Sequence, residues 1–175
     1  MGLLRRGHDE DRPGAGSRYQ MRQRLLSIGD DYWIEDEQGR RAFRVDGKAL
    51  RVRQTFVLED ANGNEVAKIQ ERKLSVRDKM AIERGGESLA TVRKALVGIR
   101  DRFSIDVAGG GELHAKGNMV DHEYEIDLEG RTVATVSKRW FRVRDTYGVE
   151  IAPGEDDALV LAIAVCVDAL SHRGN

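Results

Sequence analysis

Residues 158–167 read ALVLAIAVCV, and this stretch decides the fold that we predict for the chain. Ten consecutive apolar residues give a helix no polar face, whereas a helix on a protein surface has one. Pro153-Gly154 and the acidic run 155–157 precede the stretch, as is typical of a helix start. We therefore predict a helix over about 156–172 that is enclosed on all sides.

The length of this helix limits what can enclose it. A membrane span needs about 20 apolar residues, so we expect protein rather than lipid to surround the helix. An eight-stranded barrel is filled by its own side chains, and a barrel that holds a helix about 10 Å wide needs more strands. The rest of the chain offers ten to twelve. The rival fold is a β-sandwich with the helix packed across one side, which would leave part of the helix exposed.

Short antiparallel strands are predicted between recurrent glycine-containing turns. In 141–151, odd positions are mostly apolar and even positions are polar or glycine, except at Asp145. This alternation buries one face of a strand and leaves the other in water. Segment 87–95 also accepts a helical interpretation. The other predicted strands are 31–36, 41–46, 49–59, 65–72, 77–84, 101–107, 112–116, 119–128 and 131–139.

One pattern occurs three times, as Asp36-x-x-Gly39, Asp60-x-x-Gly63 and Asp127-x-x-Gly130. We expect each copy to be a hairpin, because glycine tolerates the positive φ of a tight turn and aspartate accepts hydrogen bonds from nearby backbone amides. No copy carries the further acidic ligands of a calcium loop.

Composition bounds the functional class. The chain has 175 residues, enough for one ordinary domain, and its 29 Lys and Arg nearly balance its 30 Asp and Glu. This balance does not favour nucleic-acid binding. Residues 1–18 are predicted to be a disordered tail without a secretory signal, followed by one domain over 19–173. The single cysteine excludes a disulfide framework within the chain, and we expect a cytoplasmic protein.

Several stretches resemble one family. These are Tyr19–Asp30, Ser137–Phe141, Asp145–Ile151 and the apolar helix with its Asp168. Together they are similar to the LURP-one-related family of the tubby C-terminal-like superfamily, which also includes phospholipid scramblase-like proteins. The resemblance implies a twelve-stranded barrel around a central C-terminal helix, with structural roles for Trp140, Asp145, Tyr147 and Asp168. It brings no catalytic motif. Its tubby-type relatives bind phosphoinositides.

Catalytic, metal and cofactor sites find little support in the residues. His122 lies between Asp121 and Glu123, but alternation along a strand would point the histidine away from both carboxylates. We expect surface residues there and no metal site, His114 included. Cys166 lies among apolar residues, where a thiol is inert. The chain has no nucleotide-binding glycine motif. We therefore expect no cofactor and no enzymatic activity.

Asp168 is the polar residue of the predicted helix. We expect it near the barrel mouth, satisfied by an arginine or by backbone amides. The alternative is a buried acid in a ligand cavity.

Two arginine pairs are the candidate binding residues. Arg51 and Arg53, and Arg142 and Arg144, are spaced so that each pair shares one strand face, and guanidinium groups suit phosphate. The leading hypothesis is a binding module for anionic lipid head groups at the inner membrane surface. The alternative is an interaction or structural scaffold with an unknown protein partner. An uncharacterised enzyme comes third.

Overall fold

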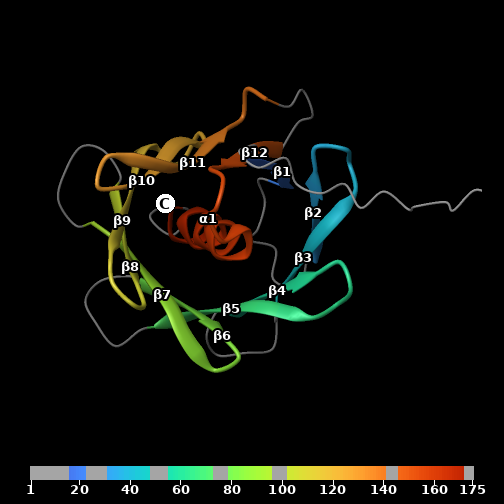
Figure 1. The fold of residues 1–175 in the computed structure, drawn as a ribbon, viewed down its shortest axis with the longest axis horizontal. Coiled ribbons are helices and arrows are strands. Elements are labelled where there is room, and N and C mark those ends of the chain that lie inside the picture. The colour runs from blue at the N-terminus through green and yellow to red at the C-terminus, as the bar shows by residue number, and fades with distance from the viewer. Residues whose placement is uncertain are drawn as a thin grey trace, which may run out of the picture.

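The computed structural model describes residues 16–22, 31–47, 55–72, 79–95, 102–140 and 146–171. These residues form twelve β-strands followed by one α-helix (Figure 1). The strands are β1 Ser17–Arg22, β2 Tyr32–Asp36, β3 Arg41–Gly47, β4 Thr55–Asp60, β5 Glu65–Arg72, β6 Lys79–Arg84, β7 Glu87–Lys94, β8 Arg102–Val107, β9 Glu112–Asn118, β10 Glu123–Leu128, β11 Arg131–Ser137 and β12 Thr146–Ile151, and the helix is α1 Asp157–Ser171.

The strands close into a single antiparallel barrel. Each strand pairs with its neighbours in sequence, and β1 completes the ring by pairing with both β2 and β12. Tyr19 of β1, for example, lies opposite Val149 of β12 and Asp36 of β2. The predicted fold class and the number of strands implied by the family resemblance are therefore confirmed.

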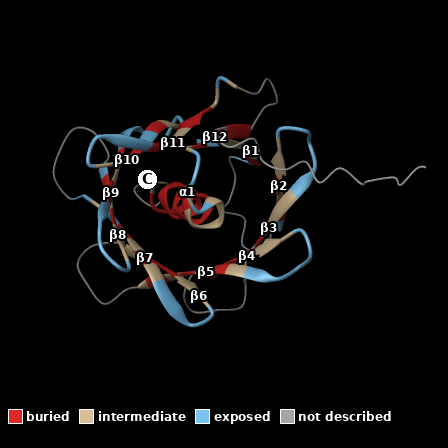
Figure 2. Cartoon of the chain, in the orientation of Figure 1, coloured by how far each residue is buried: buried red, intermediate tan, exposed pale blue. Residues whose placement is uncertain are grey.

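Side chains alternate between the inside and the outside of the barrel. In β5, Ala67 and Ile69 are fully buried, whereas Lys68 and Gln70, which follow them, are only half-buried. Alternating side chains point to opposite faces of a strand, so each strand lines the core with every second residue. Figure 2 shows the result, with exposed residues concentrated in the hairpin turns around a buried centre.

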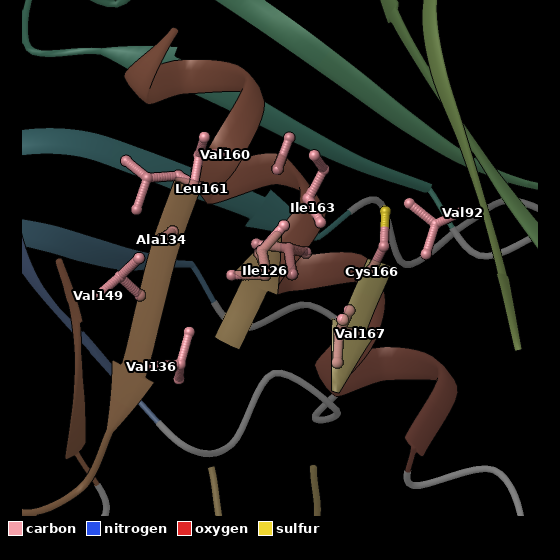
Figure 3. Packing of buried hydrophobic residues seen from close by; sticks show 14 of the residues in the cluster. Val92, Ile126, Ala134, Val136, Val149, Val160, Leu161, Ile163, Cys166 and Val167 are labelled. Carbon is pink, nitrogen blue, oxygen red and sulfur yellow. The ribbon is translucent and has the colours of Figure 1, made fainter. Parts of the chain in front are cut away.

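The helix α1 runs through the middle of the barrel (Figure 1). Every residue from Val160 to Leu170 is buried, a run of three helical turns without an exposed face. Figure 3 shows Val160, Leu161 and Ile163 of the helix among valines, alanine and isoleucine of the surrounding strands. The enclosed helix is confirmed, and the β-sandwich alternative is wrong. Within the described residues, no helix combines the length and apolar character needed to cross a membrane.

The repeated Asp-x-x-Gly pattern forms hairpins, as predicted, but in two versions. The carboxylate of Asp36 accepts hydrogen bonds from the backbone amides of residues 38 and 40, and Asp60 does the same with residues 62 and 64. Gly39 and Gly63 have positive φ. The third copy differs, because Leu128 pairs directly with Arg131 across a two-residue turn. Asp127 there forms an ion pair with Lys116 instead.

The structure decides between the alternatives for one predicted segment and corrects the boundaries of others. Segment 87–95 is a strand, β7, which removes the helical alternative. The predicted strand 119–128 is wrong in its first half, because residues 119–122 form the turn between β9 and β10. β1 begins at Ser17, two residues before the expected start of the domain. Residues 1–15, for which a disordered tail is expected, lie outside the described residues.

Candidate functional site

The two ends of the barrel carry different residues. Consecutive strands run in opposite directions, so every second connection lies at the same end. The connections β2–β3, β4–β5, β6–β7, β8–β9 and β10–β11 share one end, where α1 also begins. We call this the proximal end. The opposite end, which contains the β9–β10 turn and the last residues of α1, is the distal end.

At the proximal end, three strands hold the start of α1. Arg84 of β6 donates two hydrogen bonds to the Asp156 carboxylate, over 2.9 and 3.2 Å. The same carboxylate accepts a bond from the Leu159 amide, as a helix N-cap does. Partial burial opposes ionisation of Asp156, but these hydrogen bonds lower its pKa below the ordinary value.

The two residues flanking Asp156 are held in the same way. Glu155 pairs with Arg131 of β11, and Asp157 accepts a 2.6 Å hydrogen bond from the hydroxyl of Tyr19 in β1. The predicted acidic helix start is therefore confirmed. Each of its three carboxylates is fixed to a different strand of the barrel wall.

Charge is distributed unevenly between the ends. The proximal turns, together with the two strand residues on either side, contain sixteen carboxylates and five arginines among the described residues. The carboxylates are Glu35, Asp36, Glu37, Glu59, Asp60, Glu65, Glu83, Glu87, Asp106, Glu112, Asp127, Glu129, Glu150, Glu155, Asp156 and Asp157, and the arginines are Arg18, Arg40, Arg41, Arg84 and Arg131. The corresponding distal turns and strand ends contain the cations Arg22, Arg72, Lys79, Arg93, Lys94, Arg102, Lys138 and Arg139, against the five carboxylates Asp31, Asp46, Glu71, Asp121 and Glu123.

Most proximal cations are already neutralised. Arg18, Arg40, Arg84 and Arg131 each form an ion pair with a carboxylate, and Arg41 lies over the ring of Trp33. At the distal end, Arg72 and Arg93 pair with carboxylates of the neighbouring strand. Within the described part of the chain, no ion pair involves the distal residues Arg22, Lys79, Arg102 and Lys138.

A buried polar pair lies beneath the distal rim. Nε2 of His122, in the β9–β10 turn, is 2.7 Å from Oδ1 of Asp168 on α1, and both side chains are about 1% exposed. The imidazole stacks on the ring of Tyr147 with a centroid distance of 4.2 Å. Residues 46 positions apart in the chain thus fix the turn to the end of the helix.

Three tyrosines surround this pair. Burial, followed by the nearby Asp168 carboxylate, raises the pKa of Tyr32, Tyr124 and Tyr147 well above the ordinary value. The hydroxyl groups of Tyr32 and Tyr147 are buried without a hydrogen-bond partner among the described residues. A side chain from each of β2, β10 and β12 therefore faces Asp168 inside the barrel.

The β9–β10 turn has a backbone that is determined by its sequence. Gly117 has φ +141°, and a Cβ atom there would lie 2.5 Å from the carbonyl oxygen of Glu123, so only glycine fits. Asn118 bonds the amide and the carboxylate of Asp121. His122 has φ +53°, which directs its side chain into the barrel together with the buried Met119.

Glu123 organises the residues after β11. Its carboxylate accepts hydrogen bonds from the Ser137 hydroxyl at 2.9 Å and from the Lys138 amide at 3.1 Å. The Ser137 hydroxyl in turn accepts a bond from the Arg139 amide. These bonds hold the residues that follow β11, and Trp140 packs on the outer wall beneath the guanidinium of Arg18.

Of the residues named from the sequence as binding or structural candidates, the structure describes three. Asp168 is buried near the distal end of α1 with His122 as a partner, where the sequence had suggested an arginine or backbone amides. Tyr147 is fully buried beside it, and Trp140 lies on the outer wall. Arg51, Arg53, Arg142, Arg144 and Asp145 lie outside the described residues.

The prediction for His122 is wrong. We expected a surface histidine on a strand, but the residue is buried in a turn, so strand alternation does not apply to it. Within the described ranges, no three His, Cys, Asp or Glu side chains are grouped as metal ligands. Cys166 is buried on α1, and burial raises the pKa of its thiol, as expected for an inert packing residue.

Comparison with known proteins agrees with this architecture. The X-ray structure of an Arabidopsis thaliana protein superimposes with a TM-score of 0.67 at 18% identity, covering 91% of this chain and 94% of that one. The uncharacterised protein YxjI of Bacillus subtilis is 25% identical over 106 residues, which cover 61% of this chain and 64% of the relative. LURP-one-related proteins match over residues 17–168. This match spans all twelve strands and most of α1, and the chain is a member of the LURP-one-related family.

Proposed function

We propose that this protein is a non-enzymatic binding module that attaches to anionic phospholipid head groups at the inner membrane surface from the cytoplasmic side. The observation that carries the proposal is the set of distal cations without an ion pair among the described residues, Arg22, Lys79, Arg102 and Lys138. An anionic membrane attracts each nearby lysine or arginine by about 1 kcal/mol. Four such residues therefore supply several kcal/mol of attraction at low salt.

Their positions suit a flat anionic surface. Arg22, Lys79 and Arg102 stand at the distal ends of β1, β6 and β8, and Lys138 directly follows β11. These strands are spread around the barrel rather than adjacent. A ring of cations on a rim can contact several head groups at once, whereas a pocket for one head group would gather them on neighbouring strands.

The four arginines named from the sequence fall, by their order in the chain, in connections between strands that meet at the distal end. Arg51 and Arg53 fall between β3 and β4, and Arg142 and Arg144 fall between β11 and β12. We propose that these four residues add to the attraction. Replacing all four with alanine is expected to weaken binding to anionic vesicles without changing the weak binding to neutral ones.

Vesicle co-sedimentation tests the function. The protein should bind vesicles of phosphatidylcholine with phosphatidylserine more tightly than vesicles of phosphatidylcholine alone, and added salt should remove the difference. Equal binding to both vesicle types would contradict the proposal.

A matched pair of charge reversals locates the binding surface. Lys79→Glu changes a half-buried cation at the distal end, and Lys68→Glu changes a half-buried cation in the middle of the neighbouring strand. Neither lysine has an ion pair with a described residue. Lys79→Glu should weaken binding about tenfold or more, because one attraction is lost and one repulsion is gained. Lys68→Glu should have a clearly smaller effect.

The alternative function is a scaffold for a protein partner, and the outer wall offers one observation in its favour. Trp33 and Trp140 both lie there partly exposed, each beneath an arginine. Tryptophan and arginine are enriched in protein interfaces. A stable partner recovered with the wild-type protein, lost on Trp33→Ala, together with no vesicle binding, would favour this function.

A further inference from the structure

We infer that the β9–β10 turn is a membrane-insertion tip, with Val120 entering the lipid interface while the acidic proximal end faces away from the membrane. The inference rests on the proposed function and adds to it the contact residue and the orientation. Val120 is 52% exposed, and among the described residues it is the sole large hydrophobic side chain that is exposed. It lies at the distal end, where the cations also lie.

The turn that carries Val120 is held rigidly. His122 bonds Asp168 at the end of the helix, Met119 is buried in the core, and Asn118 bonds Asp121 across the turn. Every residue around Val120 thus has a partner that fixes the backbone. An exposed apolar side chain on a backbone that is already ordered enters an interface without a further entropy cost of ordering.

Cations flank the turn on both sides. Arg102 stands at the start of β8, beside β9, and Lys138 and Arg139 follow β11, beside β10. Glu123 accepts hydrogen bonds from the Ser137 hydroxyl and the Lys138 amide and forms a 3.8 Å ion pair with Arg139, which leaves Asp121 as the exposed carboxylate nearest the tip. Peripheral attachment to a membrane usually combines two features. Apolar side chains enter the lipid interface, and cations contact the anionic head groups.

The proximal end determines the orientation. Its sixteen carboxylates outnumber its five arginines, four of which are in ion pairs. Four further carboxylates, Glu59, Glu83, Asp106 and Asp127, pair with cations that lie farther along the strands. The remaining proximal carboxylates still outnumber the proximal cations. An anionic surface repels this end and attracts the distal end, so the barrel approaches the membrane with the end of α1 first.

Site-specific fluorescence tests the inference. Val120→Cys and, as a proximal control, Asn62→Cys are each labelled with the environment-sensitive dye NBD; Cys166 is buried and does not compete for the label. On phosphatidylserine–phosphatidylcholine vesicles, NBD at position 120 should shift to the blue and be quenched by lipid-attached doxyl groups. NBD at position 62 should behave as it does in buffer.

Unlabelled variants provide the second measurement. Val120→Asp should weaken vesicle binding about tenfold, and Asp121→Asn should strengthen it, with the folded state unchanged by circular dichroism. If the protein binds vesicles but the dye at position 120 stays in water, or if Val120→Asp binds as the wild type does, the inference is overturned while the proposed function stands. If the unlabelled wild-type chain binds neither vesicle type, the proposed function fails and the inference fails with it.

Discussion

The enclosure of α1 makes a prediction that separates a buried helix from one that lies on a surface. Val165 and Val167 are two residues apart, so their side chains point about 160° away from each other around the helix axis. Both are at most 1% exposed. On a surface helix one of two such positions faces water, whereas here both face the barrel wall. Alanine at either position should therefore be costly.

The magnitude follows from the atoms removed. Valine to alanine deletes two carbon groups, each worth about 0.8 kcal/mol of burial, or about 1.6 kcal/mol before any cavity is counted. Because the barrel wall cannot collapse freely onto the helix, a cavity term raises the cost toward about 3 kcal/mol. Val120→Ala deletes the same atoms from a side chain that is half in water, and its cost should stay within about 0.5 kcal/mol.

Urea unfolding gives the measurement. The free energy of unfolding of Val165→Ala and Val167→Ala should each fall by about 1.6–3 kcal/mol, with an unchanged dependence on urea concentration. Val120→Ala makes the same chemical change at an exposed position. The difference in the free energy of unfolding between it and the helix variants therefore reports the effect of burial. If either helix variant costs less than about 0.5 kcal/mol, that side of the helix is not enclosed and the reasoning from the apolar run fails.

Three further perturbations test the buried pair, the β9–β10 turn and the four tyrosines. His122→Ala and Asp168→Ala should each lower the free energy of unfolding by about 1–3 kcal/mol, and the double variant should cost at least about 0.5 kcal/mol less than their sum; additive costs would show that the 2.7 Å bond contributes nothing. Gly117→Ala should lower stability by about 2 kcal/mol or more, because the alanine Cβ has no room; a thermal midpoint equal to that of the wild type would contradict this. Burial raises the pKa of all four tyrosines, so the folded protein keeps protons that the unfolded chain releases above about pH 10. Stability should therefore fall as pH rises past about 10, and phenolate absorbance should appear together with unfolding; phenolate formation in a chain that stays folded would refute it.

The fold was predictable because its decisive signals are local. The run 158–167 has no polar face, and β5 alternates strictly, so each indicates its own environment without reference to any partner. Gly39 and Gly63 likewise mark turns by a backbone requirement of their own. Such signals limited the number of strands to ten to twelve, and the count of twelve came from the family resemblance.

The site was less predictable because its contacts are distant in the chain. Asp168 is conspicuous as a polar residue in an apolar helix, but nothing near it in sequence identifies His122 as its partner. The pattern around residue 122 also satisfies strand alternation, so the turn was missed. Gly117-Asn118 was the available signal, since a glycine followed by asparagine favours a turn.

The charge difference between the ends could have been found from the sequence. In an up-and-down barrel the connections alternate between the ends, so summing charges over every second connection separates them. The individual ion pairs could not be found in this way. Arg84 and Asp156 are 72 residues apart, and their contact depends on how far the barrel turns before α1 enters it.

The position of α1 after all twelve strands has a consequence for biosynthesis. Translation proceeds from the N-terminus, so the whole wall is made before the residues that fill it. Until the helix is made, the apolar face of each strand remains uncovered. In addition, β1 cannot pair with β12 until β12 has been synthesised, and this pair has the longest sequence separation in the sheet. Such long-range pairing is slow and exposes nascent strands to aggregation. We therefore expect chaperones to bind the chain during synthesis. We also expect no soluble product from a chain that is truncated before Asp157.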